Sequence, residues 1–275
     1  MAIKITLSKN EKNIVGIIPA RFASSRLLGK PLADIHGKPM VIRTYESSKS
    51  SKLLNRIIIA VDDEKVYKTV IDFGAEAVLT PSTLQSGSDR IAYVAKNISA
   101  DIVVNIQGDE PFIQGKMIDQ AIQPLLFNKN IEVATLVKKI ESFDDVKSPS
   151  VVKCVFDNNN DALYFSRSPV PFIRDAKTNF GRLNSGLYYK HIGLYVFKKS
   201  TLLKFTSLPS SDLENAEKLE QLRLLENGIK IRVVETEFDT FSVDTPADLE
   251  SARKYFEKLF KKKKQEENKN HGKKN

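Results

Sequence analysis

The sequence contains a single cysteine, Cys154, and no apolar run long enough to cross a membrane. One cysteine excludes an internal disulfide framework and makes a reducing cytoplasm the expected location. The first thirteen residues, MAIKITLSKNEKN, lack the continuous apolar segment of a secretory signal. No internal repeat is visible. We therefore expect a cytoplasmic protein without membrane insertion.

The two common glycine-rich phosphate-binding motifs are also absent. There is no G-x-x-x-x-G-K-[ST] and no G-x-G-x-x-G sequence, which excludes a P-loop and a dinucleotide fingerprint. Instead, a loop carrying Arg21, Arg26 and Lys30 follows an apolar strand that begins at Ile14 and is expected to end at Pro19. Cations at the carboxyl end of a strand in an α/β sheet indicate an anion site, here a polyphosphate site. The alternative is a solvated basic loop.

The net charge of +9 is concentrated at one end of the chain. Residues 261–275 contain seven lysines and two glutamates, a net charge of +5, so the rest of the chain carries +4. This polar, low-complexity end predicts a disordered tail. The modest charge of the remainder gives no reason to expect a nucleic-acid partner.

Strand-length apolar segments alternate with amphipathic helical segments in the first half of the chain. This pattern predicts an α/β fold with a doubly wound, mainly parallel sheet. Residues 150–230 differ, because an Asn/Asp-rich turn at 157–161 joins two short strands in a hairpin. We expect an N-terminal extension at 1–13, one α/β domain at 14–260 with an inserted lobe at 150–230, and the tail.

Two carboxylates follow buried strands in similar positions. Asp109 lies in QGDEP, where Gly108 leaves room for a ligand, and Asp244 lies in SVDTP just before the last helix. Mg²⁺ prefers one or two carboxylates together with phosphate oxygens and water. Asp244 fits a helix N-cap equally well, so metal ligand and cap remain open for it.

Several other segments carry polar groups suited to a ligand. Residues 85–90, QSGSDR, place hydroxyls and a guanidinium at a helix start, which fits either an anion site or a simple cap. Arg167 could pair with the carboxylate of an acidic substrate. By themselves, His191 on a strand and Glu220 on a helix would be structural and solvated residues, and Cys154 would be buried and inert.

Seven motifs together resemble one family, from about Ile14 to about Tyr255. They are IIPARFASSRLLGKPL, QSGSDR, VNIQGDEPFI, ALYFSRSPVP, HIGLYVF, LEQLRLLENG and VDTPADLE. The chain is similar to 3-deoxy-manno-octulosonate cytidylyltransferases, or CMP-Kdo synthetases, where Kdo is 3-deoxy-D-manno-oct-2-ulosonate. The resemblance implies a Rossmann-like nucleotidyltransferase fold, a homodimer, and Mg²⁺-dependent transfer of CMP from CTP to Kdo with release of pyrophosphate. The product would serve lipopolysaccharide assembly.

The resemblance also implies roles for individual residues. The catalytic residues would be Arg21, Lys30, Asp109 and Asp244, the two aspartates holding the metal. The nucleotide would contact Arg21, Ser24, Arg26, Lys30, Ser86, Gly87, Arg90 and Gln107. The sugar acid would contact Arg167, His191, Tyr195, Glu220 and Gln221, in a lobe that also supplies the dimer contact.

The chain departs from the family pattern at four positions without losing a charged group: Leu28, Leu84, Ser88 and Ser242. The resemblance implies attack of the sugar's anomeric hydroxyl on the α-phosphorus of CTP. Such a transfer needs mainly positioning and charge stabilisation. Because no general base is apparent, our hypothesis is that the metal lowers the pKa of that hydroxyl.

Two alternatives remain open. A related cytidylyltransferase for sialic acid or 8-amino-Kdo would use the same chemistry. The motifs HIGLYVF and LEQLRLLENG disfavour sialic acid, whereas the sequence does not separate Kdo from its 8-amino analogue. A non-catalytic nucleotide- or RNA-binding protein would use the positive charge, but would need cations interleaved with aromatic residues along a groove.

Deletion of residues 261–275 distinguishes the enzyme from the charge-driven binder. An enzyme should keep its turnover rate, because the tail lies outside every motif. A tail-driven binder should lose affinity for RNA together with its salt dependence. Turnover and RNA binding measured at two salt concentrations decide between them, and a large loss of turnover would contradict the enzyme hypothesis.

Overall fold

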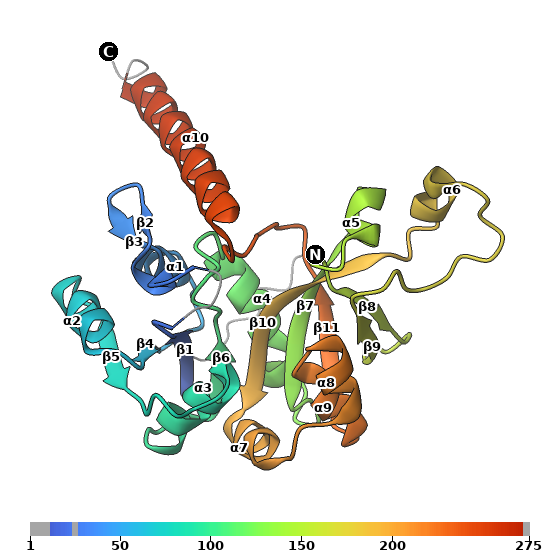
Figure 1. The fold of residues 1–275 in the computed structure, drawn as a ribbon, viewed down its shortest axis with the longest axis horizontal. Helices are drawn as coiled ribbons and strands as arrows, with labels where there is room; N and C mark the ends of the chain where they lie inside the picture. Colours follow the sequence, from blue (N-terminus) through green and yellow to red (C-terminus); the bar gives the residue numbers. More distant parts are fainter. Residues whose placement is uncertain (1–11, 24–26, 272–275) are drawn as a thin grey trace, which may run out of the picture.

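The computed structural model describes residues 12–23 and 27–271, the last ten of these as backbone only. In this part of the chain a nine-stranded sheet has the order β11-β7-β10-β6-β1-β4-β5, and β8 and β9 extend it beside β10 (Figure 1). Strand β10 runs antiparallel to β6 and β7, whereas the β1, β4, β5 and β6 pairings and the β7–β11 pairing are parallel. The expected mainly parallel α/β fold is confirmed.

The strands of this sheet are short and their residues mostly buried. Their bounds are β1 Ile14–Ala20, β4 Arg56–Val61, β5 Glu76–Leu79, β6 Ile102–Asn105, β7 Val133–Lys139, β8 Lys153–Phe156, β9 Ala162–Ser166, β10 Tyr189–Lys198 and β11 Ile231–Glu235. A separate small hairpin consists of β2 Asp34–Ile35 and β3 Lys38–Pro39.

Helices cover both faces of the sheet (Figure 1). One face packs against α1 Met40–Ser48, α2 Glu64–Asp72 and α4 Gly115–Phe127, and the other against α3 Gly87–Lys96, α7 Lys199–Ser207 and α9 Gln221–Glu226. Alternate residues of a strand face opposite sides, so Ile14 and Ile18 join the first core and Val15 and Ile17 the second. The other helical segments are η1 Lys30–Leu32, α5 Phe143–Lys147, α6 Asn179–Asn184, α8 Asp212–Glu217 and α10 Pro246–His271.

Strand β1 continues past Pro19, where the sequence predicted its end. Pro19 pairs in register with Ala60 of β4, and the strand stops after Ala20. The pairing of β1 with β6 ends at Ile17, so beyond that residue β1 has a strand neighbour on one side. Proline is tolerated at such an edge because no ladder hydrogen bond needs its missing N–H.

The segment 150–230 is not one inserted lobe. The predicted hairpin is present as β8 and β9, which extend the sheet and reach its core through Cys154 and Phe165, whereas α6 projects from the body (Figure 1). Strand β10, however, lies between β7 and β6 in the middle of the sheet. The α7 and α9 residues Leu202, Phe205, Leu222 and Leu224 belong to the main core. The long apolar run of β10 marks it as a strand, but its sequence says nothing about which strands it joins.

The last helix is longer than the sequence predicted. Helix α10 is helical as far as His271 and projects from the body (Figure 1), whereas the sequence predicted disorder from Lys261; residues 272–275 lie outside the described residues. Lysine, glutamine and glutamate are good helix formers, and extending an existing helix needs no new nucleation. The search of the described residues for a membrane-crossing helix, one both long and apolar enough, found none.

Candidate active site

Neighbouring segments hold the basic loop after β1 at both of its ends. The N–H of Phe22 donates to the Asp62 carboxylate (2.9 Å), and the N–H of Gly29 donates to the Phe22 carbonyl (3.2 Å). Gly29 has a φ of 66°, which glycine adopts without strain. The Arg21 guanidinium is exposed and donates to the Gln85 carbonyl (2.7 Å). These contacts fix the two described ends of the loop, at Phe22 and at Gly29.

Lys30 brings the two predicted carboxylates together. Its Nζ donates to Asp109 Oδ2 at 2.5 Å and to Asp244 Oδ1 at 2.8 Å. Burial alone would lower the pKa of the Lys30 ammonium, but the charges and hydrogen bonds of both aspartates raise it above its usual value. The ammonium is therefore positive at neutral pH. The other predicted loop ligands, Ser24 and Arg26, lie outside the described residues.

The turn after β6 positions Asp109 by packing tightly against β1. A Cβ on Gly108 would lie 2.6 Å from the Pro19 carbonyl oxygen, closer than real Cβ contacts. Thr44 Oγ1 donates to the Gly108 carbonyl (3.1 Å), and the N–H of Val243 donates to the Asp109 carbonyl (2.9 Å). Gly108 is thus needed because the backbone of Pro19 approaches it closely. The sequence had suggested a different reason, namely that a glycine here leaves room for a ligand.

The structure resolves the two interpretations of Asp244. Thr245 Oγ1 accepts from the N–H of Asp248 (3.2 Å), and the Asp248 carboxylate accepts from the N–H groups of Asp244 and Thr245 (3.1 and 2.8 Å). This reciprocal pair caps α10. The carboxylate of Asp244 is therefore not the cap and is directed to Lys30.

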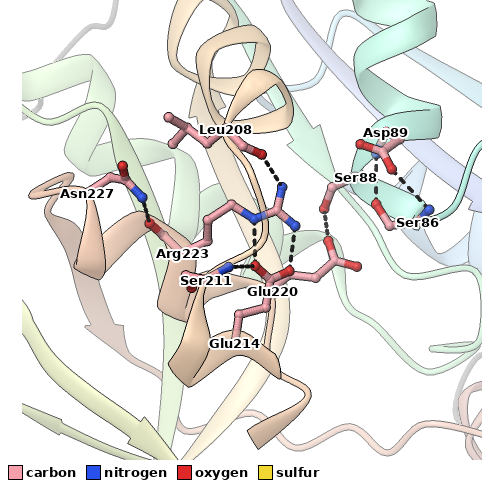
Figure 2. Close-up of polar contacts among 9 residues, drawn as sticks. All are labelled: Ser86, Ser88, Asp89, Leu208, Ser211, Glu214, Glu220, Arg223 and Asn227. Carbon is pink, nitrogen blue, oxygen red and sulfur yellow. Dashed lines mark hydrogen bonds and ion pairs between the residues drawn. The ribbon is translucent and has the colours of Figure 1, made fainter. Parts of the chain in front are cut away.

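At the start of α3 the predicted helix cap is present, and a second serine makes a contact of its own. Ser86 caps the helix, because its Oγ accepts from the N–H of Asp89 (3.1 Å). Ser88 Oγ donates to Glu220 Oε2 at 2.5 Å, which links α3 to the start of α9 (Figure 2). Gly87 borders both cavities described below. Burial raises the pKa of Glu220, so it is not the solvated residue that its helical position suggested.

Arg90 is not brought to the predicted nucleotide site. Its side chain is fully buried, lines neither cavity, and pairs with Asp62 (3.0 Å) and with Thr80 Oγ1. The same Asp62 accepts from the N–H of Phe22 in the basic loop. Arg90 therefore helps to hold the basic loop indirectly. It pairs with the Asp62 carboxylate, which accepts the hydrogen bond from the start of the loop.

Two adjoining cavities open at the carboxyl ends of the parallel strands. The smaller, about 310 Å³, is lined by the basic loop and by Lys30, and the larger, about 820 Å³, extends toward β10 and α9. Both are within the usual size range of ligand pockets. The residues common to both are Gly87, Gln107, Asp109 and Asp244. The two carboxylates thus stand at the boundary between the cavities.

A break between two helices holds Arg167 at the larger cavity. Lys218 has a φ of 54°, so α8 ends at Glu217 and α9 begins afresh at Gln221. The guanidinium of Arg167 donates to the carbonyls of Glu217 (2.7 Å), Lys218 (3.4 Å) and Pro149 (2.9 Å). These three partners are neutral carbonyl oxygens, so the guanidinium keeps its charge for an anion.

The other predicted sugar-acid residues border the same cavity. Burial lowers the pKa of His191 to about 3, so its ring is neutral, and one ring nitrogen lies 3.0 Å from Thr135 Oγ1. Within the described part of the chain, the buried Tyr195 hydroxyl and Gln221 Nε2 have no hydrogen-bond partner. Buried polar groups are normally paired, and these two lie where a ligand could pair with them.

Sequence reasoning missed two charged residues of this cavity. Burial raises the pKa of Glu110 to about 7, and Glu110 accepts a hydrogen bond from Thr240 Oγ1. Lys190 pairs with Asp239 (2.6 Å), in the segment that leads to Asp244. Glu110 lies inside a predicted motif, directly after Asp109, and Lys190 directly precedes another motif, which begins at His191. That adjacency was the available signal.

Comparisons with known proteins establish the family of this chain. The cytidylyltransferase family model matches residues 15–231. The 3-deoxy-manno-octulosonate cytidylyltransferase of Geobacter metallireducens is 51% identical over 253 residues, which cover 90% of this chain and 97% of that protein. This chain belongs to the 3-deoxy-manno-octulosonate cytidylyltransferase family.

Solved structures agree with this family membership. A CMP:2-keto-3-deoxy-manno-octonic acid synthetase, solved in complex with CTP, superposes with a TM-score of 0.84 at 41% identity, covering 90% of this chain and 99% of that one. A 4-diphosphocytidyl-2C-methyl-D-erythritol synthase from Anaerococcus prevotii has a TM-score of 0.58 at 16% identity and covers 90% and 99%. The latter shares the fold alone.

Replacing Arg90 tests its buried role in this family member. Arg90→Met leaves the Asp62 carboxylate buried without its guanidinium, which should lower the free energy of unfolding by about 3 kcal/mol. The matched control is Arg56→Met, which breaks an exposed pair with Glu76 and should cost less than about 1 kcal/mol. Chemical denaturation measures both, and equal effects would contradict the buried ion pair.

Proposed function

We propose that this enzyme transfers CMP from CTP to Kdo with release of pyrophosphate, that it depends on Mg²⁺, and that it supplies activated Kdo for lipopolysaccharide assembly in the cytoplasm. The observation that carries the proposal is the position of Asp109 and Asp244, which face one cation at the boundary between two adjoining cavities. A reaction that joins two substrates needs such a shared boundary.

The smaller cavity suits the triphosphate of CTP. Arg21 and Lys30 border it from the loop after β1, and Gly87 borders it at the first turn of α3. A helix N-terminus with nearby cations attracts phosphate. As pyrophosphate leaves, these cations would offset the negative charge that grows on its oxygens. Ser24 and Arg26 stay predicted ligands of the same phosphates.

The larger cavity suits a sugar acid. Arg167 would pair with the carboxylate, since its guanidinium has neutral partners in the described structure. The orphan Tyr195 hydroxyl and Gln221 amide would bond to sugar hydroxyls. These contacts would orient the anomeric hydroxyl toward the boundary, where it would attack the α-phosphorus of CTP in line with the leaving pyrophosphate.

The two aspartates fit a magnesium ion. The Lys30 ammonium already stands between them as a cation, so their geometry accommodates positive charge. Clusters of three or more His, Cys, Asp or Glu are absent among the described residues. Two carboxylates suit an ion that takes its other ligands from phosphate and water. When bound, Mg²⁺ would supply positive charge to a phosphate oxygen and favour ionisation of the attacking hydroxyl.

We also propose that two copies associate through residues 163–184, the stretch from β9 to the end of α6. Large apolar side chains there are exposed: Leu163 is 62% exposed, and Phe172 and Phe180 are each 74% exposed. Several exposed large apolar side chains within one stretch of chain favour a protein partner. A second copy of this chain would cover them in a homodimer.

The acceptor is tested by pyrophosphate release with CTP and Mg²⁺ against Kdo, 8-amino-Kdo and sialic acid. We expect the highest kcat/KM with Kdo. Preference for 8-amino-Kdo or sialic acid would show that Kdo is not the acceptor, while the proposed transfer of CMP from CTP would stand. Release with none of the three, while CTP binds, would contradict the proposed transfer.

Asp109→Asn tests the catalytic carboxylate. Turnover should fall by about a hundredfold or more, because the variant removes a negative charge that would hold the metal next to the reacting phosphates. CTP binding, measured by calorimetry, should persist because the loop cations remain. Asp72→Asn, at the exposed end of α2, is the control and should keep full turnover. Normal turnover in Asp109→Asn would refute the role.

A further inference from the structure

The Lys30 ammonium lies where a cation shared by the two carboxylates would have to lie. Its nitrogen is 2.5 Å from Asp109 Oδ2 and 2.8 Å from Asp244 Oδ1. The three side chains come from η1, from the turn after β6 and from the segment after β11. Their meeting is therefore a product of the tertiary fold. This inference rests on the metal site of the proposed function.

An ammonium and a divalent ion exclude one another at this position. Both would use the same carboxylate oxygens, and like charges a few ångströms apart in a half-buried site repel strongly. The exposed fractions of the three side chains are 14% for Lys30, 24% for Asp109 and 32% for Asp244, so water screens the repulsion only in part. Entry of a metal requires Lys30 to leave.

The Lys30 ammonium can also occupy a second position, in the smaller cavity. It borders the smaller cavity together with Arg21 and Ala23, and its four-carbon stem can swing the ammonium toward that space without moving the backbone. A triphosphate in this cavity would offer the ammonium new anionic partners. Without a nucleotide, the aspartates are the anions that the structure gives it.

We propose that Lys30 is an exchange cation. Before the nucleotide binds, it neutralises Asp109 and Asp244 and keeps their carboxylates close together. When the triphosphate draws the ammonium away, the preformed pair becomes open to Mg²⁺. Metal binding thereby depends on nucleotide binding. Without nucleotide, Mg²⁺ binds weakly because it must displace the Lys30 ammonium from the two carboxylates.

The test measures Mn²⁺ binding to the full-length protein by electron paramagnetic resonance, without nucleotide. Lys30→Met removes the ammonium and keeps the length of the side chain, so Mn²⁺ affinity should rise by about tenfold. Lys38→Met, which breaks an exposed pair with Glu46, is the matched control and should change nothing. Melting temperatures with and without Mn²⁺ verify folding, and Lys30→Gln repeats the measurement with a polar side chain.

Further variants separate the exchange from the metal site itself. In Lys30→Met/Asp109→Asn the gained Mn²⁺ affinity should vanish. If Lys30→Met and Lys30→Gln gain nothing, while Asp109→Asn abolishes Mn²⁺ binding to the wild-type complex with CTP, the exchange is overturned and the metal site stands. If Asp109→Asn leaves Mn²⁺ binding to that complex unchanged, the metal site and the exchange both fall.

Discussion

Two carboxylates that repel one another are held side by side, and a single ammonium makes that arrangement stable. Asp109 and Asp244 are 135 positions apart in the sequence. Their segments are joined by a backbone hydrogen bond from the Val243 N–H to the Asp109 carbonyl. Removing the positive charge would leave two partly buried anions without the cation that they share, which is costly. This junction also joins the two cavities, because its carboxylates border each of them.

Around the junction, the protein uses backbone contacts to hold charged groups without neutralising them. The Arg167 guanidinium rests on carbonyl oxygens that a break between two helices turns toward it. Arg21 likewise donates to a backbone carbonyl. Neutral partners fix the orientation of a cation and leave its charge for a ligand. Arg90, by contrast, is paired with Asp62 and fully buried, which suits support rather than binding.

Much of the candidate site was predictable because its residues fall at the ends of predictable strands. The turn with Asp109 follows the apolar strand β6, and Lys30 belongs to the loop after β1. The choice for Asp244 between cap and ligand was not predictable, because both roles suit an aspartate before a helix. Thr245 and Asp248 exclude the cap by capping α10 with each other, which leaves the Asp244 carboxylate paired with Lys30. Arg90 was misplaced because a helix-start guanidinium looks the same whether it points outward or inward.

The sequence by itself determined the family, the α/β alternation and the chemical types of the site residues, since these depend on local order along the chain. Only the tertiary structure decided that β10 lies in the middle of the sheet, that Arg90 points into the core, and that Lys30 stands between the two aspartates. Such contacts depend on which strands become neighbours and on how side chains share the space between them. Neither is encoded in the spacing of residues along one segment.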